Sequence, residues 1–425
     1  MKKTDSLYKH YVEILERELF PAMGCTEPVA LAYAAAKACE VLEKTPEKVI
    51  VEISGNIVKN VKSVVVPNTG GRKGIKASIA AGVIVGNSEK KLELLADITD
   101  KQRQELGEFL NTVPIIINMA DTERSLEIII TVVAGESWAR VKIIDAHTNI
   151  ISIEKDGQVL LDNEHNTSQD DEKNNYKLDV ASILDFADSV DLNDVRHLIE
   201  RQIELNTAIS NEGLKNDYGA NIGTVLLERF GDDIRVKAKA AAAAGSDARM
   251  SGCDMPVIII SGSGNQGLTA SLPVIEYAKY LGSSQDALIR ALVVSDLITI
   301  HMKNAIGRLS AYCGVVCAGA AAGAGIAYLH GGRLDEVAHT LVNALAITSG
   351  IICDGAKPSC AAKIAASVDA GILGFEMYEN GQQFYGGDGI VSKGVENTIN
   401  NVSRLSTEGM RETDKKIIQI MLADE

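Results

Sequence analysis

The almost unbroken series of helical patterns after Leu178 is the feature that most constrains the fold. Apolar residues recur there at helical spacing, in segments that end at Gly, Pro or Asp/Ser clusters. Only 4% of the residues are aromatic, whereas Ala and Gly are abundant. Because small side chains let helices approach closely, this composition predicts a tightly packed helical core. The helical segments span 180–190, 191–211, 235–248, 270–282, 284–307, 313–329, 333–353 and 361–378.

A different pattern occupies residues 48–160, where short runs rich in β-branched residues are bounded by turn residues. We predict an α+β protein in which a large helical domain carries an inserted or appended α/β domain. The helical domain is assigned residues 1–47 and 178–425, the α/β domain residues 48–160, and a polar linker residues 161–177. The expected strands span 48–54, 61–67, 113–119, 125–135, 137–145 and 149–155, and the expected helices of this domain span 74–85 and 100–111.

The charge balance limits the partners that we expect. The formal net charge is −15, and no run of Lys and Arg interrupts it, so nucleic acid and anionic membranes are disfavoured. The N-terminal segment lacks the apolar core of a secretory signal, which favours a cytoplasmic protein. Residues 309–329 are uncharged and long enough to span a bilayer, but their Ala, Gly, Ser and Cys content favours a buried helix.

Seven cysteines are present, and this odd number in a protein expected to be cytoplasmic favours metal-binding or catalytic roles over disulfides. Cys353 is expected to end one helix and Cys360 to begin the next, with a six-residue loop between them. Together with Cys313 they offer three thiols, and no CxxC pair of a zinc ribbon is present. Three thiolates without a fourth ligand would suit a cluster with one open iron. The alternative is that each is a small buried hydrophobic residue.

A glycine-rich segment at 261–271 follows the apolar run 256–260 and leads into a helix expected from about Leu268. Its backbone N–H groups could form an anion site for a carboxylate or phosphate. Gly262, Gly264 and Gly267 also match the spacing G-x-G-x-x-G, but the surroundings lack βαβ alternation. We therefore favour carboxylate binding over dinucleotide binding.

The turn Gly-Cys-Thr-Glu-Pro at 24–28 enters an Ala-rich helix and places a thiol and a carboxylate at its positive end. At this position we expect the pKa of Cys25 to fall. From the residues alone, however, we favour an ordinary helix cap, with Thr26 or Cys25 as the N-cap and Glu27 interacting favourably with the dipole. Further polar clusters at 54–60, 66–74, 211–219 and 245–254 are each interpreted as solvated turns, and His301 in 301–307 as a helix histidine.

Taken together, "GCTEPVALAYAAA", "GNIVKN", "PNTGG", "GSGNQGLTASLPVI", "YCG" and "GIICDGAKPSCAAKIA" resemble the L-cysteine desulfidase family, which is related to the iron–sulfur L-serine dehydratase alpha chain. The resemblance covers essentially the whole chain. It implies an oxygen-sensitive [4Fe–4S] cluster held by Cys313, Cys353 and Cys360, with the fourth iron left for substrate. It also implies that Cys25 is the catalytic thiol, which the family's desulfidases have and its serine dehydratases lack. Cys253 and Cys317 fall outside the motif.

The implied reaction is a lyase reaction of cysteine catabolism that needs no pyridoxal phosphate: elimination of sulfide from L-cysteine gives pyruvate, ammonia and hydrogen sulfide. In it, the Cys25 thiolate is the candidate base. The alternatives are an L-serine ammonia-lyase of the same chemistry and a non-catalytic cysteine or iron–sulfur sensor. We expect a small amino-acid substrate and a possible homo-oligomer. The residues expected to bind the substrate are Thr26, Glu27, Asn56, Lys59, Asn265, Gln266 and Gly267.

Overall fold

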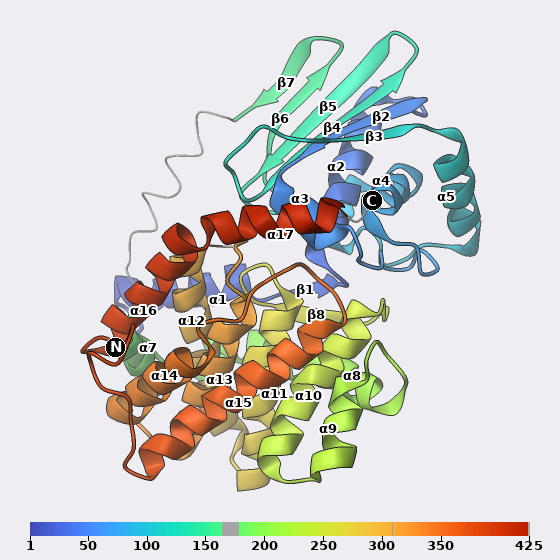
Figure 1. Cartoon of the computed structure of the whole chain (residues 1–425). Helices are drawn as coiled ribbons and strands as arrows, with labels where there is room; N and C mark the ends of the chain where they lie inside the picture. Colours follow the sequence, from blue (N-terminus) through green and yellow to red (C-terminus); the bar gives the residue numbers. More distant parts are fainter. Residues whose placement is uncertain (164–177, 308, 424–425) are drawn as a thin grey trace.

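The computed structural model describes residues 1–163, 178–307 and 309–423 of the chain. A helical unit and a sheet with its own helices lie against each other (Figure 1). Each unit has its own hydrophobic core. This arrangement confirms the predicted α+β class with a large helical domain.

The sheet has six strands in the order β3-β2-β4-β5-β6-β7, and β2 and β3 run parallel while the other pairs are antiparallel. Alternate residues of β2, such as Val49, Val51 and Ile53, are buried, as expected for a sheet covered on one face. The edge strand β7 was not predicted. The strands are β2 (Lys48–Ile53), β3 (Ile115–Met119), β4 (Glu127–Ala134), β5 (Ser137–Ile144), β6 (Ile150–Lys155) and β7 (Gln158–Asp162).

Helix α2 is the central element beneath this sheet, where it contacts β4, β5 and α4. A Cβ at Gly82 of α4 would lie 2.1 Å from the carbonyl oxygen of Ala32, so only glycine permits this approach. The sequence prediction grouped α2 with the helical domain, but its residues belong to the core of the sheet. The helices of this unit are α2 (Thr26–Leu42), α3 (Gly55–Val61), α4 (Gly74–Val85), η1 (Ser88–Glu93) and α5 (Asp100–Thr112).

Two predicted segments of the α/β domain differ from the structure. Residues 61–67 form the end of α3 and an irregular loop instead of a strand, because Val61, Val64 and Val66 are buried without pairing to the sheet. Only an isolated bridge between Val65 and Lys73 remains there. Of the predicted linker, residues 161 and 162 belong to β7, and residues 164–177 lie outside the described part of the chain.

Helix α13 is the centre of the helical unit and is surrounded by α11, α12, α14 and α15. A Cβ at Gly319 would lie 2.4 Å from the Ser367 carbonyl oxygen of α15. Small residues therefore set the helix spacing, as the composition predicted. The helices are α1 (Ser6–Glu18), α7 (Val180–Ser189), α8 (Leu192–Lys215), α9 (Ile222–Phe230), α10 (Ile234–Met250), α11 (Gly264–Leu281), α12 (Gln285–Ile306), α13 (Gly314–Leu329), α14 (Leu334–Thr348), α15 (Ser359–Glu379) and α16 (Val395–Arg404).

The uncharged segment 309–329 thus supplies a helix buried among other helices, as expected. Within the described residues, no helix combines the length and the apolar character needed to cross a membrane.

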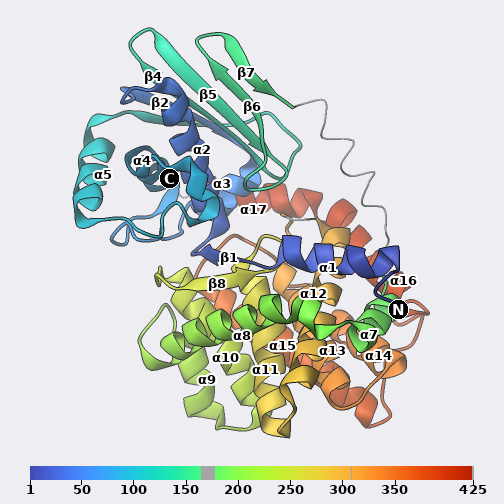
Figure 2. The ribbon, with the colours of Figure 1, turned by 180° about the vertical axis from the view of Figure 1, so that it is seen from behind.

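Within the described residues, the two units are joined near both ends of the chain. Strand β1 (Phe20–Met23) pairs antiparallel with β8 (Pro256–Ile259) and leads directly into α2. At the other end of the chain, η2 (Leu405–Gly409) is followed by α17 (Arg411–Ala423), which lies against α3. Figure 2 shows β1 and α1 crossing the back of the molecule between the units. At the contact between α3 and α17, Lys59 pairs with Asp414 at 2.5 Å.

A buried carboxyl in the helical unit gives a first prediction. Asp296 of α12 is fully buried, and its Oδ1 accepts a hydrogen bond from Gln202 Nε2 at 3.1 Å, while Oδ2 has no partner. Burial raises the pKa of Asp296 to about 7. Since an unfolded Asp titrates near pH ~3.9, the native state binds more protons between these two pH values. Stability is therefore lost as pH rises from about 4 to about 7.

We expect Asp296→Asn to stabilise the protein at pH 8 by up to about 4 kcal/mol and to have a much smaller effect near pH 4. The amide keeps an acceptor for Gln202 and removes the buried charge. The free energy of urea unfolding, measured for both proteins at the two pH values, tests this expectation. An effect of equal size at both would contradict it.

Candidate active site

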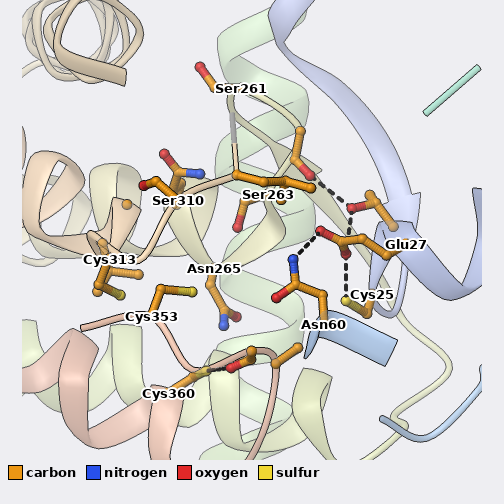
Figure 3. Close-up of a pocket in the computed structure, with 18 of the residues that line it drawn as sticks. Cys25, Glu27, Asn60, Ser261, Ser263, Asn265, Ser310, Cys313, Cys353 and Cys360 are labelled. Atoms are coloured by element: carbon orange, nitrogen blue, oxygen red, sulfur yellow. Dashed lines mark hydrogen bonds between the residues drawn. The ribbon is translucent and has the colours of Figure 1, made fainter. Parts of the chain in front are cut away.

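A cavity of about 100 Å³ lies where the two units meet. Its lining comes from both of them: the start of α2, the end of α3, the β5–β6 hairpin, the end of α10, and the segments that open α11, α13 and α15. Figure 3 shows Cys25 and Glu27 at one side of the cavity and Cys313, Cys353 and Cys360 at the other. Four of the seven cysteines, far apart in sequence, therefore share one cavity.

Four helices begin at this cavity. Cys25, Ser263 and Cys313 are the N-caps of α2, α11 and α13, and Cys360 lies in the first turn of α15. None of the three caps makes a side-chain capping hydrogen bond, so the first N–H groups keep capacity for a ligand. Because helix N-termini carry partial positive charge, the cavity is suited to anions.

A thiol–carboxylate pair forms one wall. Cys25 Sγ donates to Glu27 Oε2 at 2.9 Å, and Asn60 Nδ2 donates to Oε1 at 3.3 Å. His147, at the tip of the β5–β6 hairpin, places Nε2 3.8 Å from Oε1, within reach of charge attraction but too far for a hydrogen bond. Burial raises the pKa of Glu27, but His147 and the hydrogen bonds outweigh burial and lower it to about 2. Glu27 is therefore an ionised carboxylate, and Thr26 fixes the turn by donating to Gly262 O at 2.9 Å.

The low pKa expected for Cys25 is wrong, because the thiol is buried beside the Glu27 carboxylate. Burial, followed by the charge of Glu27, raises the pKa of Cys25 well above that of a free thiol. The nearby Arg249 acts in the opposite direction but does not compensate. The helix dipole is thus outweighed by a buried carboxylate two residues away, so Cys25 is a protonated thiol in this structure.

We expect Glu27→Gln to lower the pKa of Cys25, because it removes a negative charge beside the thiol. The pH at which Cys25 becomes half-maximally reactive toward iodoacetamide should fall by about one unit or more. Peptide mass spectrometry of the reduced protein measures this reaction. Cys39, farther along α2, serves as an internal reference whose reactivity should not change. An unchanged or higher midpoint for Cys25 would contradict the role given to Glu27.

The three other cysteines are brought together by backbone pairing. Cys313 N donates to Ile351 O at 3.1 Å and Cys353 N donates to Ala311 O at 2.6 Å, which sets the two cysteines side by side. Their hydrogen bond raises the pKa of Cys313 and lowers that of Cys353 to about 5. Burial raises the pKa of Cys360, whose Sγ lies 3.6 Å from Gly355 O.

These residues fit an iron–sulfur cluster. Cys353 is held in its ionised form, aided by the charges of Lys59 and Lys303, and thiolates are the ligands that such clusters require. Within the described residues, no three His, Cys, Asp or Glu side chains are close enough to hold a single metal ion. A four-iron cluster has a different requirement. Each of its thiolate ligands binds a different iron, so these ligands lie farther apart than the ligands of a single metal ion. The lining also contains Gln266 Oε1 and Ser261 Oγ, both buried without a hydrogen-bond partner.

The predicted substrate residues divide into two groups. Thr26, Glu27, Asn265 and Gln266 line the cavity. Gly267, by contrast, packs on the backbone, where a Cβ would lie 1.9 Å from Ile258 O, and Asn56 and Lys59 are outside the lining.

The glycine-rich turn also differs from expectation in detail. Helix α11 begins at Gly264 instead of near Leu268, because Ser261 and Gly262 with positive φ already complete the turn. The preceding strand β8 is in a two-stranded antiparallel sheet, so the G-x-G-x-x-G spacing does not mark a dinucleotide-binding βαβ unit.

Among the lining residues that sequence reasoning missed are Asn60, His147, Arg249 and Lys303. Arg249 and Lys303 are 4% and 3% exposed, although they lie in segments that were interpreted as solvated turns or helix ends. Burial lowers the pKa of Lys303, and the neighbouring thiols oppose this effect. The sequence signal for Arg249 and Lys303 was weak because a cation beside glycines is usually solvated.

Comparison with known proteins shows the family of this chain. Residues 89–419 match the family "Serine dehydratase alpha chain". A UPF0597 protein of Desulfitobacterium hafniense is 57% identical over 99% of this chain and 98% of its own length. A UPF0597 protein of Lachnoclostridium phytofermentans is 51% identical over 98% of this chain and 100% of its own length. One of Treponema denticola is 44% identical over 100% of both chains. With this match, and with cysteines gathered at one cavity, the chain belongs to the serine dehydratase alpha chain family.

Proposed function

We propose that the protein is an iron–sulfur lyase that eliminates sulfide from L-cysteine. Its family is one of serine dehydratase-like iron–sulfur enzymes, which supports the lyase class. The observation that carries the substrate proposal is the buried thiol of Cys25, paired with Glu27 in the cavity that holds the three other cysteines. The cavity's helix N-termini and cations suit a carboxylate-bearing substrate.

Cys313, Cys353 and Cys360 would hold a [4Fe–4S] cluster, which when bound supplies a Lewis acid at its iron without a protein ligand. The hydrogen bond with Cys313 and the charges of Lys59 and Lys303 lower the pKa of Cys353. The positive helix ends at Cys313 and Cys360 act against the hydrogen bond and the burial that raise the pKa of these two thiols. A reducing cytoplasm, which we propose as the location, would keep these thiols free.

The chain's own residues orient the substrate and move its proton. Glu27, held ionised, can pair with the substrate ammonium in place of the Cys25 thiol. Burial and then the charge of Glu27 keep Cys25 protonated, and a bound cation beside Glu27 would offset the second of these and so favour loss of the Cys25 proton to solvent. The Cys25 thiolate then takes the α-proton while the Cβ–S bond breaks and its electron pair leaves with sulfide.

The product of this step is aminoacrylate, which tautomerises to an imine and reacts with water. L-Cysteine and one water are thereby converted to pyruvate, ammonia and hydrogen sulfide.

Anaerobic reconstitution with iron and sulfide, followed by assays of sulfide and pyruvate release, tests the proposal. We expect iron incorporation and equal amounts of both products from L-cysteine. A protein that stays colourless and iron-free after reconstitution would overturn it, as would a cluster-bearing protein that releases pyruvate only from L-serine. The second result would identify an L-serine ammonia-lyase, and a cluster-bearing protein inactive on both substrates would identify a sensor.

A further inference from the structure

We propose that Arg249 is the receptor for the substrate α-carboxylate and thereby determines which amino-acid derivatives enter the site. This inference deepens the proposed function and rests on it. Arg249 is the penultimate residue of α10 and lines the cavity with 4% of its surface exposed. The sequence prediction gave this task to Asn265, Gln266 and Gly267.

The guanidinium is held in one orientation. Its Nη1 donates to Asn265 Oδ1 at 3.1 Å, while Asn265 Nδ2 is directed to Met250 Sδ at 3.6 Å. A Cβ at Gly264 would lie 2.4 Å from Arg249 Nε and 2.8 Å from Cζ, so the guanidinium lies directly against the start of α11. Glycine is the residue that leaves this room.

With Nη1 bonded to Asn265, the Nε edge of the guanidinium has no hydrogen-bond partner. Nε is buried without a hydrogen-bond partner, and across the described residues the bond from Nη1 is the only one that the group makes. No carboxylate of the described residues lies within ion-pair distance of it. Nε and Nη2 form a planar fork that matches the two oxygens of a carboxylate.

A buried cation whose only partner is a neutral amide is incomplete, because burial without a counter-charge costs free energy. An anionic ligand would supply that charge. Arg249 lines the same cavity as Cys25 and Cys360. A carboxylate on the unpartnered fork would therefore lie in the cavity that also holds the candidate base and a candidate cluster ligand, where an α-amino acid must lie to react.

The test measures binding without turnover. L-Alanine keeps the carboxylate and ammonium of the substrate but has no leaving group, and ethylamine is the same molecule without the carboxylate. By calorimetry on the anaerobically reconstituted protein, we expect wild type to bind L-alanine and not ethylamine. Arg249→Gln should weaken L-alanine binding by about 10- to 100-fold.

Arg235→Gln is the matched control, since Arg235 lies at the exposed start of the same helix and pairs with Asp233. It should leave L-alanine binding unchanged. If Arg249→Gln does not fold, Arg249→Lys serves instead, because it keeps the charge and removes the fork, and it should weaken binding several-fold.

Three results would overturn the inference: L-alanine affinity unchanged in Arg249→Gln or Arg249→Lys, wild type binding ethylamine as tightly as L-alanine, or wild type binding neither. A variant that keeps its L-alanine affinity but loses iron would assign Arg249 to the cluster instead. Because binding and product release are separate readouts, failure of the lyase proposal would show only in the assays for sulfide and pyruvate.

Discussion

Cys25→Ser is expected to keep its iron and lose sulfide and pyruvate release by about 10³-fold or more, the scale of a removed general base. The serine hydroxyl can still donate to Glu27, so the turn at the start of α2 should be preserved. An alcohol, however, has a pKa far too high to yield a base in this site. Iron content, visible absorbance and product release, measured on the same anaerobic preparation, check the expectation.

Cys39→Ser provides the matched control for this substitution, because Cys39 lies on the same helix and outside the cavity lining. It should retain both iron and activity. Substantial activity in Cys25→Ser would remove Cys25 from its role as base. Loss of iron in that variant would show that Cys25 belongs with the cluster ligands.

Cys353→Ala and Cys360→Ala are each expected to reduce bound iron from about four atoms per chain to nearly none after reconstitution. The hydrogen bond with Cys313 lowers the pKa of Cys353, which favours the thiolate form that an iron ligand needs. The visible absorbance of the cluster should disappear together with the iron. Colorimetric iron analysis and absorbance spectra of anaerobic samples measure both.

Cys317→Ala is the control for these two, since Cys317 is fully buried one turn along α13 from Cys313 and does not line the cavity. It should retain its iron, with a modest loss of stability from the missing sulfur. Equal iron loss in Cys317→Ala would show that the effect is a general disturbance of the packing around the cavity and not the loss of a ligand. Full iron retention in Cys353→Ala would exclude it as a ligand.

Most elements could be predicted because their signals are local. The alternation in β2 and the helical spacing in α4 and α5 arise from neighbouring residues, and the predicted positions agree with the observed ones within a few residues. Residues 61–67 have the same β-branched composition, yet they form a loop, since they find no strand to pair with. Pairing is a tertiary property, so composition alone could not exclude that strand.

The place of α2 shows the same limit. Its sequence is apolar nearly all round, and it is buried on most sides. The apolar sequence of such a helix predicts that the helix is buried, but not which element it packs against. Only the packing against β4 and β5 assigns it to the sheet.

The sequence by itself determined the fold class, the helical core built on small residues, and the cysteines worth considering, because periodicity, composition and spacing are properties of the chain. The tertiary structure determined the pKa values of those residues and the groups with which they pair. It buried Cys25 beside the Glu27 carboxylate and so raised the pKa of the thiol, and it buried Arg249 with Nε unpartnered. The physical reason is that pKa and charge pairing depend on distance and desolvation, which residues far apart in sequence set only when the two units meet.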